Sequence, residues 1–223
     1  AAALDDAAEL TAHAVGAGVA GCLVVPPFYF KNLPEDGVFA SFAALIDRMG
    51  GTGFNLFLYH FPQMSAVPIP HDVIRRLIEA YPGVIAGPKD SSGDLDNMLA
   101  LIKGFPAMRI FSGTERYLLP VLEAGGAGCI TAGGNITSSE IGRLYAHWRA
   151  KGSGPEADAL QERVTELRSL LEGAPMIAAM KALLARHRNA PDLARAMPPM
   201  SAADNADVEA LRSRLDAAGF ALP

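Results

Sequence analysis

The chain has 223 residues, of which 50% are hydrophobic and 19% are charged, with a formal net charge of −5. This composition supplies enough apolar material for a sizeable core and excludes an intrinsically disordered chain. The mild net charge, without runs of Lys or Arg, indicates neither a nucleic-acid nor a membrane partner, and no apolar run has the length of a membrane span. Cys22 and Cys129 lie in separate short apolar runs, which favours reduced thiols and a cytoplasmic location over a disulfide framework.

Short apolar runs alternate along the chain with amphipathic stretches of helical period. In chain order, the first predicted elements are a helix at 4–15, a strand at 21–25, a helix at 35–49 and a strand at 55–59. There follow a helix at 71–81, strand 84–89, helix 94–103, strand 108–111, helix 115–123, strand 128–131 and a helix at 138–150 with Ser138 as N-cap. After the joint KGSGP (151–155), three further helices are predicted at 156–171, 176–187 and 205–217.

Strict alternation of strand and helix predicts parallel strands joined by right-handed crossovers. The strands are continuously apolar, so we expect both faces of the sheet to be buried. No strand is followed by a G-x-G-x-x-G turn, and this absence favours a TIM barrel over a dinucleotide-binding open sheet. We predict barrel elements over 1–151 and a C-terminal helical region over 155–223. Because a barrel needs eight strands and only five are readable, either about three βα units are absent from this chain or the closed-barrel interpretation fails.

Two predicted strands end in residues suited to carbonyl chemistry, Tyr59 and Lys89. The carboxyl ends of parallel strands form the active face of such folds, and these strands are neighbours. Desolvation lowers the pKa of an amine, and a neutral amine attacks carbonyl carbon. A phenol within hydrogen-bond reach can relay the protons of that reaction. A solvated rim lysine and a core tyrosine are the alternative interpretation of the same pattern.

The sequence resembles the dihydrodipicolinate synthase and N-acetylneuraminate lyase family of Schiff-base aldolases over nearly its whole length. The segments that carry the resemblance are CLVVPPFYF (22–30), LYHFPQMSAVPI (58–69), GPKDSSGDL (87–95), FSGTERYLLPVLEAGGAGCIT (111–131) and GAPMIAAMKALL (173–184). The resemblance implies a TIM barrel with C-terminal helices, a homotetramer, and a covalent imine with a 2-oxo acid, typically pyruvate, in place of any cofactor.

Individual residues match the functional positions of this family. Lys89 matches the imine-forming lysine, Tyr59 the proton-relay tyrosine, and Tyr29 a tyrosine that reaches across a subunit interface. Ile130 and Thr131 match the segment that lines the floor beside the imine. We also expect His60, Ser91 and Ser112 to contact substrate, although packing at residue 60 and turn or cap roles explain His and Ser equally well at such positions. The histidines are too scattered to predict a metal site.

Three departures from the family pattern bear on function. The Gly-Thr-Thr-Gly-type loop that binds the 2-oxo carboxylate is absent, and it would precede residue 1. Met64 stands where dihydrodipicolinate synthases place an arginine for the carboxylate of the aldehyde, and methionine cannot make that charge-assisted pair. His60 replaces the usual asparagine, and Pro88 lies inside the lysine strand, where it removes a ladder donor and predicts local irregularity.

The leading hypothesis is therefore a lyase or aldolase that joins or splits a 2-oxo acid and an aldehyde through Lys89. The runner-up is 4-hydroxy-tetrahydrodipicolinate (dihydrodipicolinate) synthase proper in lysine biosynthesis, and a dehydratase with the same imine chemistry is also open. A third hypothesis, of another class, is a non-catalytic homologue or an incomplete barrel fragment.

Overall fold

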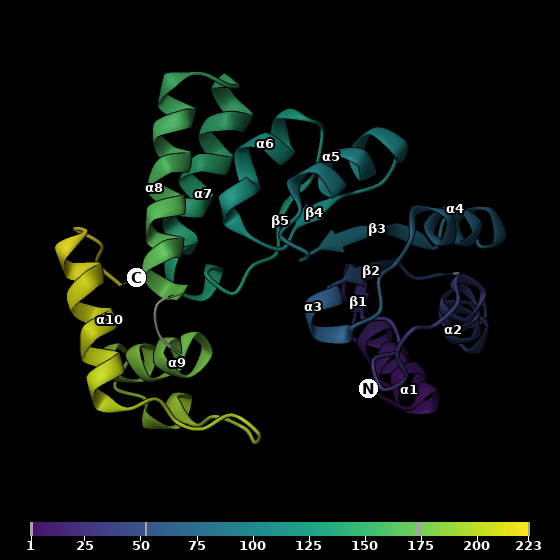
Figure 1. Ribbon diagram of the computed structural model, residues 1–223, viewed down its shortest axis with the longest axis horizontal. Coiled ribbons are helices and arrows are strands. Elements are labelled where there is room, and N and C mark those ends of the chain that lie inside the picture. The colour runs from purple at the N-terminus through teal and green to yellow at the C-terminus, as the bar shows by residue number, and fades with distance from the viewer. Residues whose placement is uncertain (1, 52, 173–174, 223) are drawn as a thin grey trace. The chain divides into compact units, whose positions relative to one another are not determined.

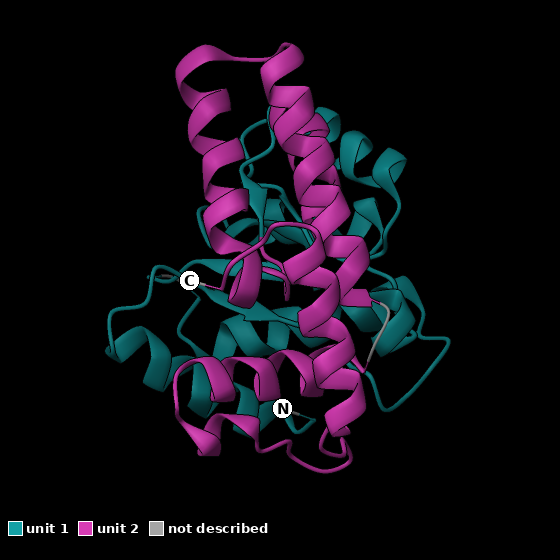
Figure 2. Cartoon of the chain, turned by 90° about the vertical axis from the view of Figure 1, so that its left-hand side faces the viewer, with its two compact units in different colours: residues 1–113, 124–129 teal, residues 114–123, 130–223 magenta. Residues whose placement is uncertain are grey.

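The computed structural model describes residues 2–51, 53–172 and 175–222 (Figure 1). Gly173 and Ala174, which begin one of the segments that carry the family resemblance, lie outside the described residues. The chain divides into two compact units (Figure 2). Unit 1 comprises residues 1–113 and 124–129, and unit 2 comprises residues 114–123 and 130–223. The predicted boundary at 151–155, between barrel elements and C-terminal helices, stays a prediction. The compact units are a different division of the chain, with boundaries after residues 113, 123 and 129.

Unit 1 contains a parallel sheet of five strands whose spatial order follows the chain order. The strands are β1 (Cys22–Val24), β2 (Leu56–His60), β3 (Ile85–Asp90), β4 (Phe111–Ser112) and β5 (Gly128–Cys129). A doubly wound sheet reverses its strand order at a switch point, whereas a TIM barrel adds each strand beside the previous one. The order β1-β2-β3-β4-β5 confirms the predicted TIM-barrel class, with five strands among the described residues.

The helices of unit 1 follow the predicted positions closely. They are α1 (Leu4–Gly16), α2 (Glu35–Arg48), α4 (His71–Ala80) and α5 (Leu95–Gly104), with the short α3 (Pro62–Ser65) unforeseen. The first three long helices carry acidic residues in their first turn, and the Asp94 side chain caps α5 by accepting the backbone N–H of Asn97.

The two faces of the sheet are buried to different extents. Leu56 and Leu58, which face the helices, are fully buried. Leu23 on the other face is 38% exposed, and Phe57 and Phe111 are only partly buried. The expectation that both faces are buried is therefore wrong for this chain. Within the described residues β1 pairs only with β2 and β5 only with β4, so the sheet does not close over this face.

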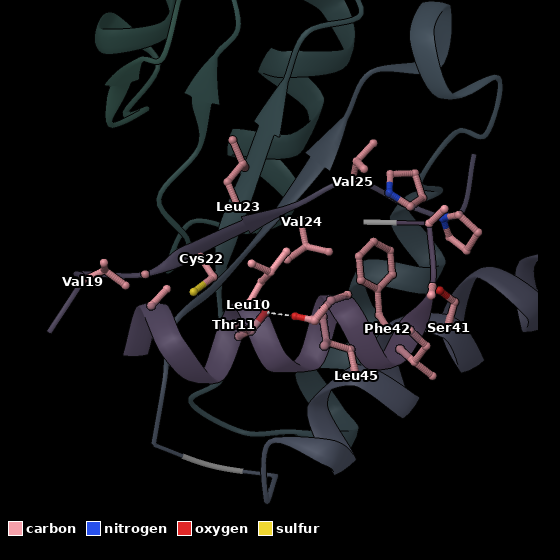
Figure 3. A pocket seen from close by; sticks show the side chains of 18 residues that line it. Leu10, Thr11, Val19, Cys22, Leu23, Val24, Val25, Ser41, Phe42 and Leu45 are labelled. Atoms are coloured by element: carbon pink, nitrogen blue, oxygen red, sulfur yellow. Dashed lines mark hydrogen bonds between the residues drawn. The ribbon is translucent and has the colours of Figure 1, made fainter. Parts of the chain in front are cut away.

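An apolar groove of about 510 Å³ lies between α1, α2 and β1 (Figure 3). Its labelled lining includes Leu10 from α1, Leu23 and Val24 from β1, and Phe42 and Leu45 from α2. The described residues thus leave apolar surface uncovered beside β1 as well as on the open face of the sheet.

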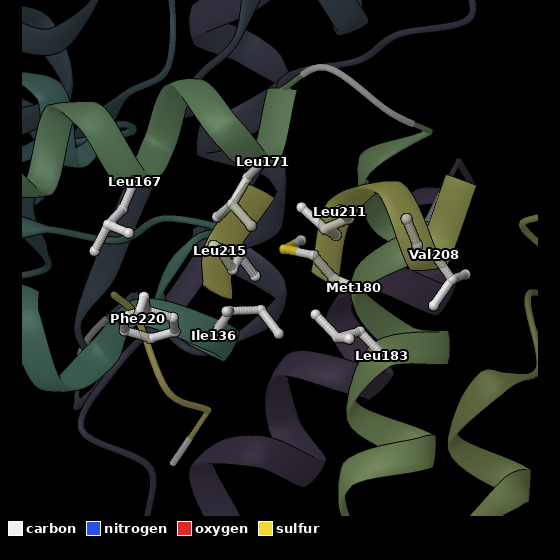
Figure 4. Packing of buried hydrophobic residues seen from close by; sticks show 10 residues of the cluster. Ile136, Leu167, Leu171, Met180, Leu183, Val208, Leu211, Leu215 and Phe220 are labelled. Atoms are coloured by element: carbon white, nitrogen blue, oxygen red, sulfur yellow. The ribbon is translucent and has the colours of Figure 1, made fainter. Parts of the chain in front are cut away.

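Unit 2 is helical and has its own hydrophobic core. Its elements are the 3₁₀ turns η1 (Glu115–Tyr117) and η2 (Pro191–Ala194), and helices α6 (Leu118–Glu123), α7 (Gly134–Lys151), α8 (Pro155–Glu172), α9 (Met176–His187) and α10 (Asn205–Ala217). Leu171 from α8, Met180 and Leu183 from α9, and Leu211 and Leu215 from α10 meet in this core (Figure 4).

Four sequence predictions near the end of unit 1 and in unit 2 differ from the structure. Strands β4 and β5 have two residues each and are shorter than predicted, and the helix expected at 115–123 divides into η1 and α6. Ser138 is not an N-cap, because α7 begins at Gly134. Thr137 has non-helical backbone angles inside α7, so the regular part of the helix starts at the predicted place after a kinked first turn. Among the described residues, no helix combines the length and apolar character needed to cross a membrane.

Candidate active site

Lys89 and Tyr59 lie side by side at the carboxyl ends of β3 and β2. They are register partners in the parallel ladder, so their side chains leave the same face of the sheet. Lys89 Nζ lies 4.0 Å from the centroid of the Tyr59 ring, and the lysine is only 8% exposed. Among the residues that the structure describes, no carboxylate forms an ion pair with this amine. Burial of an unpaired amine is costly for the fold and is suited to a nucleophile.

A glycine bulge sets the position of Lys89 on its strand. The ladder between β2 and β3 shifts register between Leu56 and Phe57, where Gly87 enters with φ +149°. A Cβ at Gly87 would lie 2.1 Å from the carbonyl oxygen of Arg109, so no other residue fits without displacing backbone. The irregularity predicted from Pro88 is therefore confirmed, and its centre is the glycine before the proline.

Aromatic side chains follow one another on the face of the sheet that carries Lys89. Tyr59 stacks on Phe61 with ring centroids 5.7 Å apart, and Phe57 meets Phe111 edge-on at the same distance. Phe111 is the register partner of Lys89 on the other side. Of these rings, that of Tyr59 lies directly against the amine, and Lys89 is 8% exposed.

Ser91 continues the face that carries Lys89. Its backbone N–H donates to the carbonyl of His60 at 2.8 Å, which extends the ladder beyond the strand end. A Cβ at Gly113 would lie 2.0 Å from Ser91 Oγ, so the hydroxyl packs directly over that glycine. Side chains alternate along a strand, and Ser91 is two residues beyond Lys89, so its predicted contact with substrate is compatible with the geometry.

His60 and Ser112 are directed away from this face. Both are register partners of Asp90, and Asp90 and Ser112 are fully buried on the side of the helices. Residues adjacent on a strand point to opposite faces, so His60 cannot share the face of Tyr59, nor Ser112 that of Phe111. Their expected direct contact with substrate does not fit this geometry.

A buried polar network, which sequence reasoning missed, lies behind Lys89 on the helix-facing side. Asp90 accepts hydrogen bonds from the Ser92 N–H at 2.8 Å and from Asn97 Nδ2 at 2.6 Å. Asn97 Oδ1 in turn lies 3.1 Å from His71 Nε2, which therefore carries the proton. His60 Nδ1 accepts the Ile69 N–H at 3.1 Å. Burial lowers the pKa of His60 and His71 lowers it further, against the opposing effects of Asp90 and Asp94.

Tyr29 is 79% exposed on the loop after β1, with its ring edge-on to Phe30 at 5.2 Å between centroids. Lys31 ties this loop to α3, because its amine donates to the carbonyls of Phe28 and Ser65. The loop that carries Tyr29 and the loop that follows Tyr59 are thereby joined. An exposed tyrosine held in this way is available to a second molecule, as its predicted role requires.

Ile130 and Thr131 belong to unit 2, and their predicted contribution to the floor of the Lys89 site stays a prediction. Ile130 is 40% exposed. The Thr131 hydroxyl donates to Oε2 of the fully buried Glu115, which also pairs with Arg168 at 3.5 Å. Within unit 2 this threonine is therefore part of a buried ionic network. Among the described residues, no three His, Cys, Asp or Glu side chains gather closely enough to hold a metal ion.

Known proteins resemble this chain in sequence and in fold. Residues 1–218 match the model of the dihydrodipicolinate synthetase family. An uncharacterized DapA-like lyase of Chloroflexus aurantiacus is 36% identical over 95% of this chain and 69% of its own length. The 4-hydroxy-tetrahydrodipicolinate synthase 2 of Halalkalibacterium halodurans is 30% identical over 79% of this chain, which spans 59% of that protein. This chain spans less than two thirds of the length of several curated relatives that it matches.

The fold has counterparts among solved structures. One is the chloride-inhibited dihydrodipicolinate synthase of Acinetobacter baumannii, determined with pyruvate. It is 25% identical to this chain, with a TM-score of 0.84 over 99% of this chain and 73% of its own.

Proposed function

Because the chain belongs to the dihydrodipicolinate synthetase family, we propose that it acts as a lyase through an imine between Lys89 and pyruvate or a related 2-oxo acid. The observation that carries this proposal is the buried amine of Lys89, held against the Tyr59 ring without a carboxylate partner. The pyruvate bound to the A. baumannii enzyme supports the choice of ketone.

The proposed reaction begins when the Lys89 nitrogen adds to the ketone carbon and its proton passes to the ketone oxygen. Tyr59 donates the second proton that this oxygen needs to leave as water, which yields the protonated imine. Loss of a proton from the neighbouring carbon then gives an enamine, and this carbon attacks the aldehyde. The reverse sequence breaks the same carbon–carbon bond. Water added to the imine releases the product and restores the amine.

The second substrate is proposed to lack the carboxylate that dihydrodipicolinate synthase recognises on its aldehyde. Met64 lies on α3, directly after the strand of Tyr59, and is 72% exposed. A thioether offers no charge-assisted hydrogen bond to a carboxylate. We therefore favour a neutral or hydroxylated aldehyde over aspartate semialdehyde. Dihydrodipicolinate synthase proper remains the second candidate because curated relatives carry that name.

Tyr29 is proposed to support the relay from a neighbouring copy in a homo-oligomer, a tetramer by family resemblance. Its exposure and its fixed loop favour this role over a place in the core of its own chain. Cytoplasmic location remains a prediction from cysteine usage.

Borohydride trapping tests the proposal, because hydride addition to the imine carbon converts it to a stable secondary amine. The protein is incubated with pyruvate or with another 2-oxo acid and reduced with borohydride. The mass of the intact chain is then measured by mass spectrometry. We expect one adduct with the preferred acid, its loss in Lys89→Ala, and its retention in Lys103→Ala, since Lys103 is exposed on α5. No adduct with any 2-oxo acid would favour the non-catalytic hypothesis, and rapid turnover of aspartate semialdehyde would favour the synthase.

A further inference from the structure

The His60 side chain closes the segment 61–69, which follows the strand of Tyr59. Its Nδ1 accepts the Ile69 N–H at 3.1 Å, and Ile69 is 4% exposed. Since Nδ1 accepts a hydrogen bond, it carries no proton, and the neutral ring has its proton on Nε2. The segment between the two residues contains α3 and a left-handed residue, Ala66, at φ +54°. One side-chain bond therefore fastens the far end of this segment to the end of β2.

The same segment also contacts the Tyr59 ring. Phe61, its first residue, stacks on Tyr59 at 5.7 Å with an interplanar angle of 25°. The Tyr59 ring also contacts the Lys89 amine, which lies 4.0 Å from its centroid. A shift of segment 61–69 would move Phe61 and would disturb the alignment of phenol and amine.

Protonation of His60 would reverse the bond that closes the segment. Nδ1 would become a donor opposite the Ile69 N–H, which also donates, so the bond would be replaced by repulsion. The charged and titratable groups around the ring are Asp90 from β3, His71 from α4 and Asp94 before α5. Asp90 is already committed to Ser92 and Asn97 through both of its oxygens. It is therefore poorly placed to compensate for the lost bond to Ile69.

We propose that His60 is a positioning residue, which as a neutral ring holds segment 61–69 and the Tyr59–Lys89 pair in register, and which releases them when it is protonated. The catalytic consequence rests on the proposed function, whereas the release of the segment does not. The role differs from a substrate contact, since His60 lies on the face of the sheet opposite Lys89.

Hydrogen exchange of the Ile69 amide tests the structural part in the full chain. Wild type, His60→Asn and His60→Ala are compared between about pH 5 and 8, with His13→Asn, at an exposed position on α1, as the matched control. The asparagine oxygen can accept the Ile69 N–H without titrating. We expect His60→Ala to exchange about five-fold faster than wild type at the upper pH. Relative to His60→Asn, wild type should lose protection as the pH falls, and His13→Asn should match wild type throughout.

Equal Ile69 exchange in His60→Ala and wild type at the upper pH would overturn the inference. A ratio of wild type to His60→Asn that does not change with pH would also overturn it.

The initial rate of pyruvate–borohydride trapping supplies the catalytic readout. The ratio of wild type to His60→Asn should be near one at the upper pH and should fall as His60 protonates, by up to about ten-fold per pH unit. A constant ratio would refute the catalytic consequence. If no variant forms an adduct at any pH, the proposed function fails, while the exchange of Ile69 still decides the structural inference.

Discussion

Replacement of Lys89 by methionine should remove the imine and leave the protein at least as stable as wild type. Methionine keeps the apolar stem of lysine, so the packing against β2 is retained. The change removes a buried amine that has no ion-pair partner among the described residues, a cost to the fold of about 1.5 kcal/mol. It also removes the contact with the Tyr59 ring, which contributes about 0.5 kcal/mol. We therefore expect Lys89→Met to raise the free energy of unfolding by about 1 kcal/mol.

Guanidinium denaturation followed by circular dichroism measures this effect, with thermal unfolding as a second readout. A gain of about 1 kcal/mol corresponds to a rise in Tm of roughly 3 °C for a chain of this size. Lys103→Met is the matched control, because Lys103 is exposed at the end of α5 and its replacement should change stability by less than about 0.5 kcal/mol. If Lys89→Met were less stable than wild type by more than about 1 kcal/mol, Lys89 would be a residue that stabilises the fold. That result would refute the inference that the buried amine is present for catalysis at a cost in stability.

Changes at Gly87, Tyr59 and His60 test separate parts of the site. Gly87→Ala should destabilise the protein by about 3 kcal/mol or more in the same denaturation assay, because the new Cβ meets the carbonyl of Arg109 at 2.1 Å in a backbone region that favours glycine; a loss below about 1 kcal/mol would contradict this. Tyr59→Phe should keep the stack on Phe61 and the fold but slow trapping about 100-fold, and an unchanged rate would exclude the phenol from the relay. Burial lowers the pKa of His60 in the folded state, so its contribution to stability should be complete above the unfolded pKa of about 6.5 and should be lost as the pH falls below it; His60→Asn should lack this component, and identical pH profiles would refute it.

The helical part of the fold was predictable from sequence because apolar period and breakers are local signals. Helix α9 was predicted with its observed ends, and α1 and α2 to within one residue. Helix α3 escaped prediction because four residues that end in a left-handed alanine carry no periodic signal. The short strand β4 was overestimated, since an apolar run does not reveal how many of its residues find ladder partners.

The candidate site was predictable in part. The positions of Lys89 and Tyr59 at adjacent strand ends followed from alternation of strands and helices, and the structure places them in contact. The side of the sheet that His60 faces also follows from the sequence. His60 comes directly after Tyr59 on the same strand, and successive side chains of a strand point to opposite faces. No sequence motif predicts the hydrogen bonds between Asp90 and Asn97 and between His60 and Ile69. They depend on how α5 and segment 61–69 pack behind the sheet.

The exposed face of the sheet shows what strand sequence alone does not determine. The continuous apolar character of β1 and β2 predicted burial on both sides, and one side is only partly covered in this chain. Apolar residues indicate a tendency to be buried, but coverage also depends on which other elements are present to pack against them.

Tandem mass spectrometry of the digested protein shows which lysine carries the reduced pyruvate adduct. We expect a single modified residue, Lys89, with Lys31, Lys103, Lys151 and Lys181 unmodified. A reproducible adduct on any of those four lysines in place of Lys89, or an unmodified Lys89 in protein that has been shown to be folded, would contradict it.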